Sequence, residues 1–490
     1  MKTSGIIKGW LLESMHKPNG IRLLLISIDG ARLDLVKRWD LPFLHSLLQT
    51  GTSGPLRTEF PPHTSIAFAS LLTGTDPSHH GVYNYVKLRN GFLIPVTGYD
   101  LRAKTFMETL SDAGLSVGCV NVPMMPPQAL RRGIVVGSWD SPPGTPYFYP
   151  PELAAVLESF DYEIIRYGVA NRELPKVAYE IERKRTELAK YLLRKYLFDL
   201  FVIHYEGTEL LHHKFASFMS STSGNKNLEE EQTVATFYQK IDELLRSLVE
   251  EAKPENIIVM SDHGFCALEG VVNINHLLAE QGLLSYSHSR RVLATIANLL
   301  EARGVNNQLI YRLGTRIYDK RKTGVQLPFI WERTKAFCTS QLGSIRVNLR
   351  GRERFGVVDP NEYEPTRERI TETLRSLRLV SDVYRKEELY DESGPFISDI
   401  DDLYVKLNGC RITADYYGRT EKGFHTLDGL LIRSGKELTS GPILNIRDVA
   451  TLVCSVFAVN HTAIYRDLHL YHPDDNAEVM RRLRALGYIS

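Results

Sequence analysis

The chain has 490 residues, of which 43% are hydrophobic and 24% are charged, so it can bury a large core and is not intrinsically disordered. Its 59 Lys and Arg residues balance 58 Asp and Glu residues, which gives a formal charge of +1. This balance excludes a polyanion binder whose affinity depends on a broad basic surface, so we expect no polymeric nucleic acid as a partner.

The N-terminal segment, residues 1–19, carries charges throughout and has no long apolar core, so we expect no secretory signal. No uninterrupted apolar run approaches the roughly 18 residues that span a bilayer. The cysteines are odd in number and scattered: Cys119, Cys266, Cys338, Cys410 and Cys454. A disulfide framework or a thiolate zinc site is therefore not expected, and we predict a soluble cytoplasmic protein without a membrane partner.

The first predicted strand is the nearly continuous apolar run at residues 21–28, which ends in Asp29-Gly30. Runs of this kind are typical of strands buried on both faces of a parallel sheet. Asp-Gly is also a common turn signal, so Asp29 is informative only together with other residues.

Thr64 follows two prolines and precedes residues 65–72, which we predict to be helical. A threonine at a helix start would lie among free backbone N–H groups at the positive end of the helix dipole. This position favours both an ionised hydroxyl and a bound phosphoryl group. Taken alone, however, such a threonine is more often a simple capping residue.

A second buried strand is predicted at residues 199–203, after a helix at 177–197. Beyond this strand, Glu209 and His213 are four residues apart, which places them on one face of a helix where they could share one ion. Glu206 and His212 lie close enough to be alternative ligands, and a solvated helix face is the better explanation of this segment when it is taken alone.

A third buried strand is predicted at residues 257–260, after a helix at 229–251, and it ends near the adjacent pair Asp262-His263. A carboxylate and an imidazole at a strand end form a compact pair of ligands, although a histidine in a turn is the alternative. Strands that alternate with helices predict an α/β fold, a doubly wound and mostly parallel sheet flanked by helices. Its ligand crevice would lie at the carboxyl ends of the strands.

The character of the sequence changes after the third strand, which predicts an inserted subdomain. We expect a first part of the catalytic core at 21–277, an inserted cap at 278–400 with helical stretches at 290–322 and 366–377, and a second part of the core at 401–490. In this last part, His425 precedes the strand-like residues 429–432.

The candidate ligands are carboxylates and imidazoles without thiolates, which suits zinc, manganese or iron in a catalytic site. Two ions about 4 Å apart would clamp the attacking and leaving oxygens of an in-line displacement. The Thr64 hydroxyl would then provide covalent catalysis through a phospho-threonine that water later hydrolyses.

Five motifs occur in order along the chain: Ser27-Ile28-Asp29-Gly30, Phe60-Pro61-Pro62-His63-Thr64, Leu72-Thr73-Gly74 with Pro77 and His80-Gly81, Ser261-Asp262-His263-Gly264, and Gly423-Phe424-His425. The ordered set resembles the alkaline phosphatase superfamily, specifically its type I phosphodiesterase/nucleotide pyrophosphatase branch. The resemblance runs from about Arg22 to the C-terminus. Residues 272–278, 351–358, 384–390 and 482–488 are similar to poorly characterised prokaryotic members of that branch.

The resemblance implies two divalent metal ions, with zinc the first expectation, and Thr64 as the nucleophile. It implies that one ion is held by Asp29, Thr64, Asp262 and His263, and the other by Glu209, His213 and His425.

The chain departs from the family pattern at two positions. The family has aspartate where Glu209 stands, and the longer glutamate could still bind while shifting or weakening the second metal. The family asparagine that holds a phosphate oxygen is expected where Tyr85 stands, and Asn84, one position earlier, is our candidate substrate-binding residue.

The leading hypothesis is a metal-dependent phosphodiesterase or nucleotide pyrophosphatase that acts on a small substrate, possibly a nucleotide. A phosphomonoesterase is the closest alternative; it needs extra positive charge around the free oxygens, and Lys214 and Lys422 lie near the motifs. A phosphoglycerate mutase and a formylglycine sulfatase are disfavoured, the latter because no cysteine occupies the nucleophile segment. A metal-binding protein with weak catalysis that binds a nucleotide or another partner stays open because of Glu209.

Overall fold

The computed structural model describes residues 20–141, 147–166, 169–220, 227–287, 325–409, 411–413, 422–438, 443, 445–462 and 464–465. The predicted helical stretch at 290–322 and the C-terminal motif at 482–488 lie outside the described residues.

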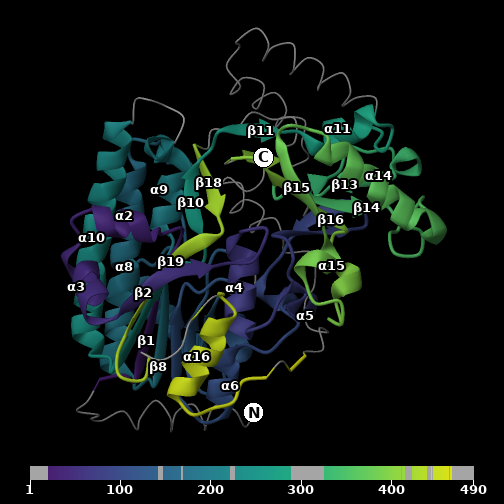
Figure 1. Cartoon of the computed structure of the whole chain (residues 1–490). Coiled ribbons are helices and arrows are strands. Elements are labelled where there is room, and N and C mark those ends of the chain that lie inside the picture. Colours follow the sequence, from purple (N-terminus) through teal and green to yellow (C-terminus); the bar gives the residue numbers. More distant parts are fainter. Residues whose placement is uncertain are drawn as a thin grey trace.

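An eight-stranded sheet forms the centre of the molecule, in the order β2-β19-β9-β1-β8-β5-β6-β7 (Figure 1). Its strands are β1 (Leu23–Ile28), β2 (Thr52–Arg57), β5 (Val117–Val120), β6 (Gly133–Val136), β7 (Phe148–Tyr149), β8 (Leu200–Tyr205), β9 (Asn256–Met260) and β19 (Asp428–Ser434). The five strands from β9 to β6 are parallel, whereas β19 is antiparallel to β9 and β2, and β7 is antiparallel to β6. The predicted α/β fold with a mostly parallel sheet is confirmed.

The predicted strands at 21–28, 199–203 and 257–260 are neighbours at the centre of this sheet. Leu23 of β1 pairs with Leu200 of β8 on one side and with Asn256 of β9 on the other. Because the three strands run in the same direction from this common register, their carboxyl ends meet at one edge. The residues that follow them are therefore brought together, as the sequence predicted.

Helices cover both faces of the sheet (Figure 1). One apolar core packs against α2 (Leu33–Arg38), α3 (Pro42–Thr50), α8 (Leu174–Lys195), α9 (Gly207–Phe215) and α10 (Leu228–Ala252). The other packs against α4 (Thr64–Thr73), α6 (Phe106–Asp112) and α16 (Asp448–Val456). Alternate residues of β1 enter the two cores, Leu24 and Ile26 the first, Leu23 and Leu25 the second, as the two-residue period of a strand requires.

A smaller, four-stranded sheet in the order β13-β14-β16-β15 lies beside the core. Its elements are β13 (Ala336–Cys338), β14 (Ser344–Val347), β15 (Val380–Arg385) and β16 (Leu403–Leu407), with α14 (Tyr363–Arg375) packed on it, where residues 366–377 were predicted to be helical. Because β16 pairs with β14 and β15, this sheet extends past the cap boundary expected at residue 400. We call residues 325–409 the cap.

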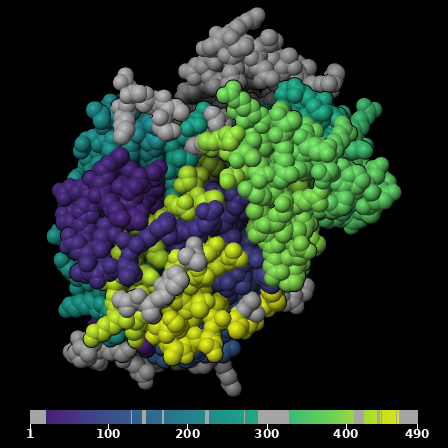
Figure 2. Space-filling view, in the orientation of Figure 1, coloured from purple at the N-terminus to yellow at the C-terminus, as the bar shows by residue number. Residues whose placement is uncertain are grey.

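Short elements complete the described structure: α5 (Pro77–His80), α7 (Ala154–Ser159), α11 (Ile274–Glu280), α15 (Lys386–Leu389), β3 (Val86–Arg89), β4 (Phe92–Pro95), β10 (Gly264–Ala267), β11 (Gly270–Val272), β12 (Val325–Gln326), β17 (Arg411–Thr413) and β18 (Gly423–Thr426). An antiparallel pair joins β10 to β18 and aligns Phe265 with His425. Figure 2 shows residues from the two ends of the chain side by side on one face, in agreement with the pairing of β2 and β19.

Cys119, Cys338 and Cys454 are free and buried, whereas Cys266 in β10 is disulfide-bonded, a bond that the scattered cysteines did not predict. Within the described ranges, no helix combines the length and the apolar character that crossing a membrane requires.

Candidate active site

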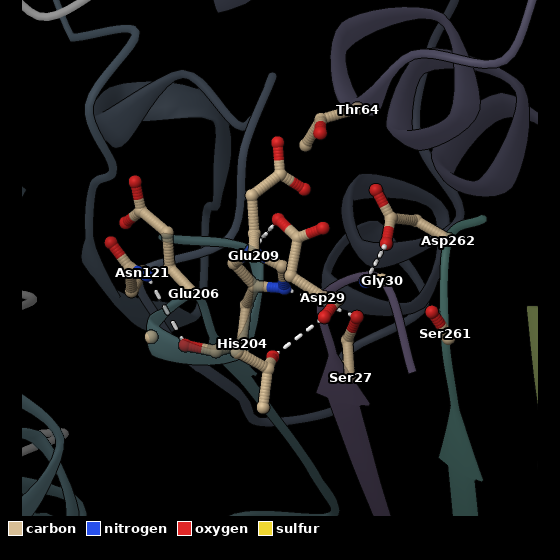
Figure 3. Close-up of polar contacts among 12 residues, drawn as sticks. Ser27, Asp29, Gly30, Thr64, Asn121, His204, Glu206, Glu209, Ser261 and Asp262 are labelled. Atoms are coloured by element: carbon tan, nitrogen blue, oxygen red, sulfur yellow. Dashed lines mark hydrogen bonds and ion pairs between the residues drawn. The ribbon is translucent and has the colours of Figure 1, made fainter. Parts of the chain in front are cut away.

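The three central strands deliver their following residues to one place. Asp29 comes directly after β1, α9 begins two residues after β8, and Asp262 and His263 follow β9. Figure 3 shows the carboxylates of Asp29 and Glu209 next to one another, with Asp262 and the Thr64 hydroxyl nearby. All of these side chains are buried.

Thr64 is the first residue of α4, as the two prolines predicted. The imidazole of His63 caps this helix, because its Nδ1 accepts a hydrogen bond of 3.1 Å from the Ser65 N–H. The ring of Tyr85 stacks on His63 at a centroid distance of 4.6 Å. Thr64 Oγ1 lies 3.2 Å from His263 Nε2, so the nucleophile candidate is next to the candidate metal ligands.

Glu209 and His213 lie one turn apart on α9 and meet His425 from β18. Glu209 Oε1 is 3.2 Å from His213 Nε2 and 3.1 Å from His425 Nε2. The glutamate that replaces the expected aspartate therefore reaches both histidines, and the predicted second ligand group is assembled.

Asp29, Asp262 and His263 form the other candidate ligand group. His263 Nε2 is 3.5 Å from Asp29 Oδ1 and 3.3 Å from Asp262 Oδ2. The same nitrogen is 3.4 Å from Glu209 Oε2, so His263 lies between the two groups. The ligand atoms of Asp29, Asp262 and His263, and those of Glu209, His263 and His425, each lie within 4.8 Å of one another.

The backbone fixes the orientation of the three histidines. The Nδ1 atoms of His213, His263 and His425 lie 3.1, 3.1 and 3.2 Å from the carbonyl oxygens of Gly423, Gly264 and Pro62. Because a carbonyl can only accept, each Nδ1 carries a hydrogen, and each Nε2 faces the acidic groups of the site. This is the arrangement of metal-binding histidines, whose second nitrogen is usually held by a carbonyl or carboxylate.

The acidic groups of the site repel one another. Burial raises the pKa of Asp29 well above its ordinary value, and the charges of Asp262 and Glu209 raise it further. Burial also raises the pKa of Asp262. Burial opposes ionisation of Glu209 too, but His425 and hydrogen bonds with Asp29 and His213 lower its pKa well below the usual range. Positive charge placed among these groups would relieve the repulsion.

His204 of β8, which no local sequence pattern predicted, supports Asp29. Its Nε2 is 3.2 Å from Asp29 Oδ2, and its Nδ1 is 3.1 Å from Ser27 Oγ. The available signal was strand register, because His204 pairs with Ser27 across β1 and β8. The register can be used only when the pairing of β1 with β8 is known, and the sequence alone does not give it.

Two other acidic or imidazole candidates lie apart from the ligand groups. Tyr238 of α10 stacks on the ring of His212 and places its hydroxyl 3.4 Å from Nε2. Glu206 is buried with its carboxylate 3.9 Å from Arg185 Nη2, and burial raises the pKa of Glu206 to about 8.

Asn84 lies in a buried network with the cap. Its side-chain N–H groups donate to Thr339 Oγ1 at 3.2 Å, Ser344 Oγ at 3.0 Å and Asp401 Oδ2 at 3.4 Å. Its side-chain oxygen accepts from the Tyr85 N–H. A substrate contact by Asn84 would therefore require this network to open, and its substrate-binding role stays a prediction.

A family model for type I phosphodiesterase / nucleotide pyrophosphatase matches residues 23–426. No curated protein sequence matches the chain. Among solved structures, the chain is similar to phosphonoacetate hydrolase from Sinorhizobium meliloti 1021 bound to phosphonoformate, with 16% identity, a TM-score of 0.59, and coverage of 89% of this chain and 96% of the other.

The fold also matches human ectonucleotide pyrophosphatase / phosphodiesterase 5, with 13% identity, a TM-score of 0.53, and coverage of 90% and 96%. Alkaline phosphatase PafA matches with 13% identity, a TM-score of 0.55, and coverage of 91% and 97%. At these identities the likeness to solved structures shows a shared fold.

Proposed function

The chain belongs to the type I phosphodiesterase / nucleotide pyrophosphatase family, hydrolases of phosphoester bonds, and from this premise we propose that it is a metal-dependent phosphodiesterase. The proposed substrate is a small phosphodiester or pyrophosphate, possibly a nucleotide. Thr64 is the proposed nucleophile.

One observation supports metal dependence above all others. The Nε2 atoms of His213, His263 and His425 and the carboxylates of Asp29, Glu209 and Asp262 face one another in a buried space. Asp29 Oδ1 and Asp262 Oδ2 accept no hydrogen bond from an N–H group of the described residues. Carboxylates buried together are unfavourable unless cations lie among them, and oxygen and imidazole ligands suit zinc, manganese or iron.

We assign one ion to Asp29, Thr64, Asp262 and His263, and a second to Glu209, His213 and His425, with His263 close to both groups. When bound, two divalent ions stabilise the attacking and leaving oxygens of a displacement at phosphorus.

Thr64 has the position that a nucleophile requires. It is buried, it opens α4, and the N–H groups of the first turn create a positive potential that suits a phosphoryl group. Its Oγ would bond to phosphorus while the ester P–O bond breaks and releases an alcohol. Water would then cleave the phospho-threonine, release the phosphate monoester and restore the hydroxyl.

A diester is favoured over a monoester because Lys422, a candidate for binding the additional negative charge of a monoester, is paired with another residue. Lys422 forms an ion pair with Glu230 of α10. A monoester carries more charge on its free oxygens and usually requires a further cation. Murine ectonucleotide pyrophosphatase / phosphodiesterase 5, which shares this fold, has been solved with AMP, so a nucleotide is the first substrate to examine.

The test compares hydrolysis of bis-p-nitrophenyl phosphate and p-nitrophenyl phosphate after chelation and reloading with Zn²⁺ or Mn²⁺. We expect metal-dependent turnover with preference for the diester. A preference for the monoester would identify a phosphatase instead, and a folded protein that is inactive with every metal would favour a binding role.

Thr64→Ala tests the nucleophile, with Thr73→Ala at the other end of α4 as a matched control. Thr73 is also buried, and its hydroxyl donates to the Ala69 carbonyl. We expect Thr64→Ala to abolish turnover and Thr73→Ala to retain it. Unchanged turnover in Thr64→Ala would rule out the covalent route.

A further inference from the structure

Helix α9, which carries Glu209 and His213, is capped by a side chain from another helix. Its own N-cap residue, Glu206, contributes no side-chain hydrogen bond to the cap. Instead, Oε1 of Glu182 on α8 accepts hydrogen bonds from the Glu206 N–H at 2.9 Å and the Gly207 N–H at 2.7 Å. A carboxylate thus occupies the positive end of α9, where the helix dipole stabilises it.

This carboxylate belongs to a fully buried ion pair. Glu182 and Arg185 have exposed fractions of 1% and 0%, and Arg185 Nη1 donates to Glu182 Oε2 at 2.5 Å. Arg185 Nη2 also donates to the Ile164 carbonyl at 3.1 Å. A buried ion pair is weak evidence for stability, because desolvation offsets much of the attraction. The role of this ion pair is instead to hold Glu182 where it fixes the position of α9.

Glycine at position 207 allows this close approach. A Cβ at Gly207 would lie 2.7 Å from Phe237 Cζ and 3.2 Å from Glu182 Oε1. Residue 207 is therefore packed between α8 and α10, and any side chain larger than hydrogen would push α9 away from Glu182.

Glu206, whose N–H is bound by Glu182, also accepts the first hydrogen bonds of α9. The Glu206 carbonyl lies 3.1 Å from the Glu209 N–H and 3.4 Å from the Leu210 N–H, both of which donate to it. Glu209 is in this first turn, and His213 lies one turn further on the same face. A shift at Glu206 would thus move both ligands together.

We propose that Glu182, held by Arg185, is a positioning residue that sets the place of α9 and so of the second metal group. This inference rests on the proposed function, because the second group has a role only if it binds an ion. Outer partners of metal ligands typically change metal affinity ~10–100-fold when they are removed.

The structure contains a matched control on α10. Asp242 accepts hydrogen bonds from the Phe43 N–H at 2.9 Å and the Leu44 N–H at 2.8 Å, at the start of α3. This is the same arrangement, a buried acid of one helix that caps the first turn of another. α3 carries none of the proposed ligands, so loss of Asp242 should affect the fold but not the site.

The experiment titrates Zn²⁺ into apo full-length protein against a chromophoric chelator and measures the affinity of each ion and the thermal midpoint. Glu182→Ala should weaken one of the two ions ~10–100-fold and leave the other unchanged. Glu182→Gln should largely restore the affinity, because its amide oxygen can still accept from both N–H groups. Asp242→Ala should lower the thermal midpoint and leave both affinities unchanged.

Unchanged affinities in Glu182→Ala would overturn the proposal. It would also be overturned if Asp242→Ala weakened the same ion equally, or if folded Glu182→Gln bound it no better than Glu182→Ala. If Glu182→Ala does not fold, Glu182→Asp takes its place, because its carboxylate is one methylene short of the N–H groups. Wild-type protein that binds fewer than two ions would instead refute the proposed function, and the inference with it.

Discussion

Among the candidate metal ligands, Glu209 is the residue that departs from the family pattern. Its extra methylene brings Oε1 within reach of His213 and His425, while Oε2 lies 3.4 Å from His263. With the backbone of α9 held in place, a shorter side chain would withdraw from all three rings.

Glu209→Asp should therefore weaken the second ion, although it restores the residue that the family expects. Loss of a charge-assisted contact costs about 1.5–3 kcal/mol, which corresponds to roughly tenfold or more in affinity. Metal titration measures this, with Glu209→Ala as the reference for complete loss of the ligand. Tighter binding in Glu209→Asp would mean that α9 readily adjusts its position.

His80 is buried away from the metal ligands, and it should make stability depend on pH. Its Nδ1 accepts from the Val82 N–H at 3.1 Å and its Nε2 lies 2.9 Å from Ser70 Oγ, so the neutral ring satisfies both contacts. Burial lowers its pKa to about 3. Because the pKa of His80 is lower in the folded than in the unfolded protein, the unfolded state binds a proton more readily below about pH 6.5. The free energy of unfolding therefore falls as the pH is lowered from about 6.5 toward 3.

We expect His80 to contribute about 1.4 kcal/mol per pH unit to this loss of unfolding free energy. His80→Asn, whose side-chain oxygen can still accept from Val82, should reduce the slope by that amount. Urea unfolding between pH 7 and pH 4 measures it, and equal slopes in the two proteins would contradict the assignment.

At this scale the sequence predicted which candidate ligands lie together, and it missed the residues that support them. Asp29, Asp262 and His263 each follow an apolar strand, and His213 follows Glu209 by one helical turn, so local patterns were sufficient. His204 and Glu182 act across neighbouring elements, and no local pattern reports such contacts. For Asn84, the cap residues that engage it are more than 250 positions away in the chain.

Secondary-structure elements place the ligands, and the β10–β18 pair joins the two ligand groups. Gly264 of β10 pairs with Thr426 of β18, and a Cβ there would lie 2.2 Å from the Asp428 carbonyl oxygen. His263 directly precedes β10 and His425 lies in β18, so the spacing of the two histidines depends on this glycine.

Gly264→Ala should destabilise the protein by about 1–3 kcal/mol and weaken metal binding, because the clash is with backbone that cannot rotate away. Gly54→Ala in β2 is the control, since its added Cβ would meet no atom within 4 Å. Thermal unfolding and metal titration check both variants. If Gly264→Ala binds metal as tightly as the wild-type protein, then β10 and β18 can shift without changing the positions of the ligands.

Helices were predictable from the sequence where apolar residues recur with the helical period. Residues 177–197 and 229–251 were predicted as helices, and the structure has α8 at Leu174–Lys195 and α10 at Leu228–Ala252. The cap boundary was harder to place because β16 is apolar like the core strands. What assigns β16 to the smaller sheet is its pairing with β14 and β15.

On the scale of the whole molecule, the core and the cap are joined by buried contacts. One apolar cluster contains Ile66 of α4 together with Phe337 and Leu403 of the cap. The hydrogen bonds from Asn84 to Thr339, Ser344 and Asp401 lie in the same region.

Asn84→Ala should cost about 1–3 kcal/mol, because it removes the buried hydrogen bonds from Asn84 to Thr339, Ser344 and Asp401. We expect the KM for bis-p-nitrophenyl phosphate to change little. Denaturant unfolding and steady-state kinetics separate the two roles of Asn84. Unchanged stability with a large increase in KM would favour the substrate-binding role instead.

The place of β19 in the main sheet has a consequence for how the protein is made. β2 is synthesised early, yet its partner in the sheet is β19, which also covers the edge of β9. A nascent chain on the ribosome therefore carries two open strand edges, and lacks His425, until residues 423–434 have been translated. Such edges invite pairing with other chains. This intermediate would have to be shielded from other chains, and a chain cut short before β18 would be prone to aggregate and would lack His425 at the candidate site.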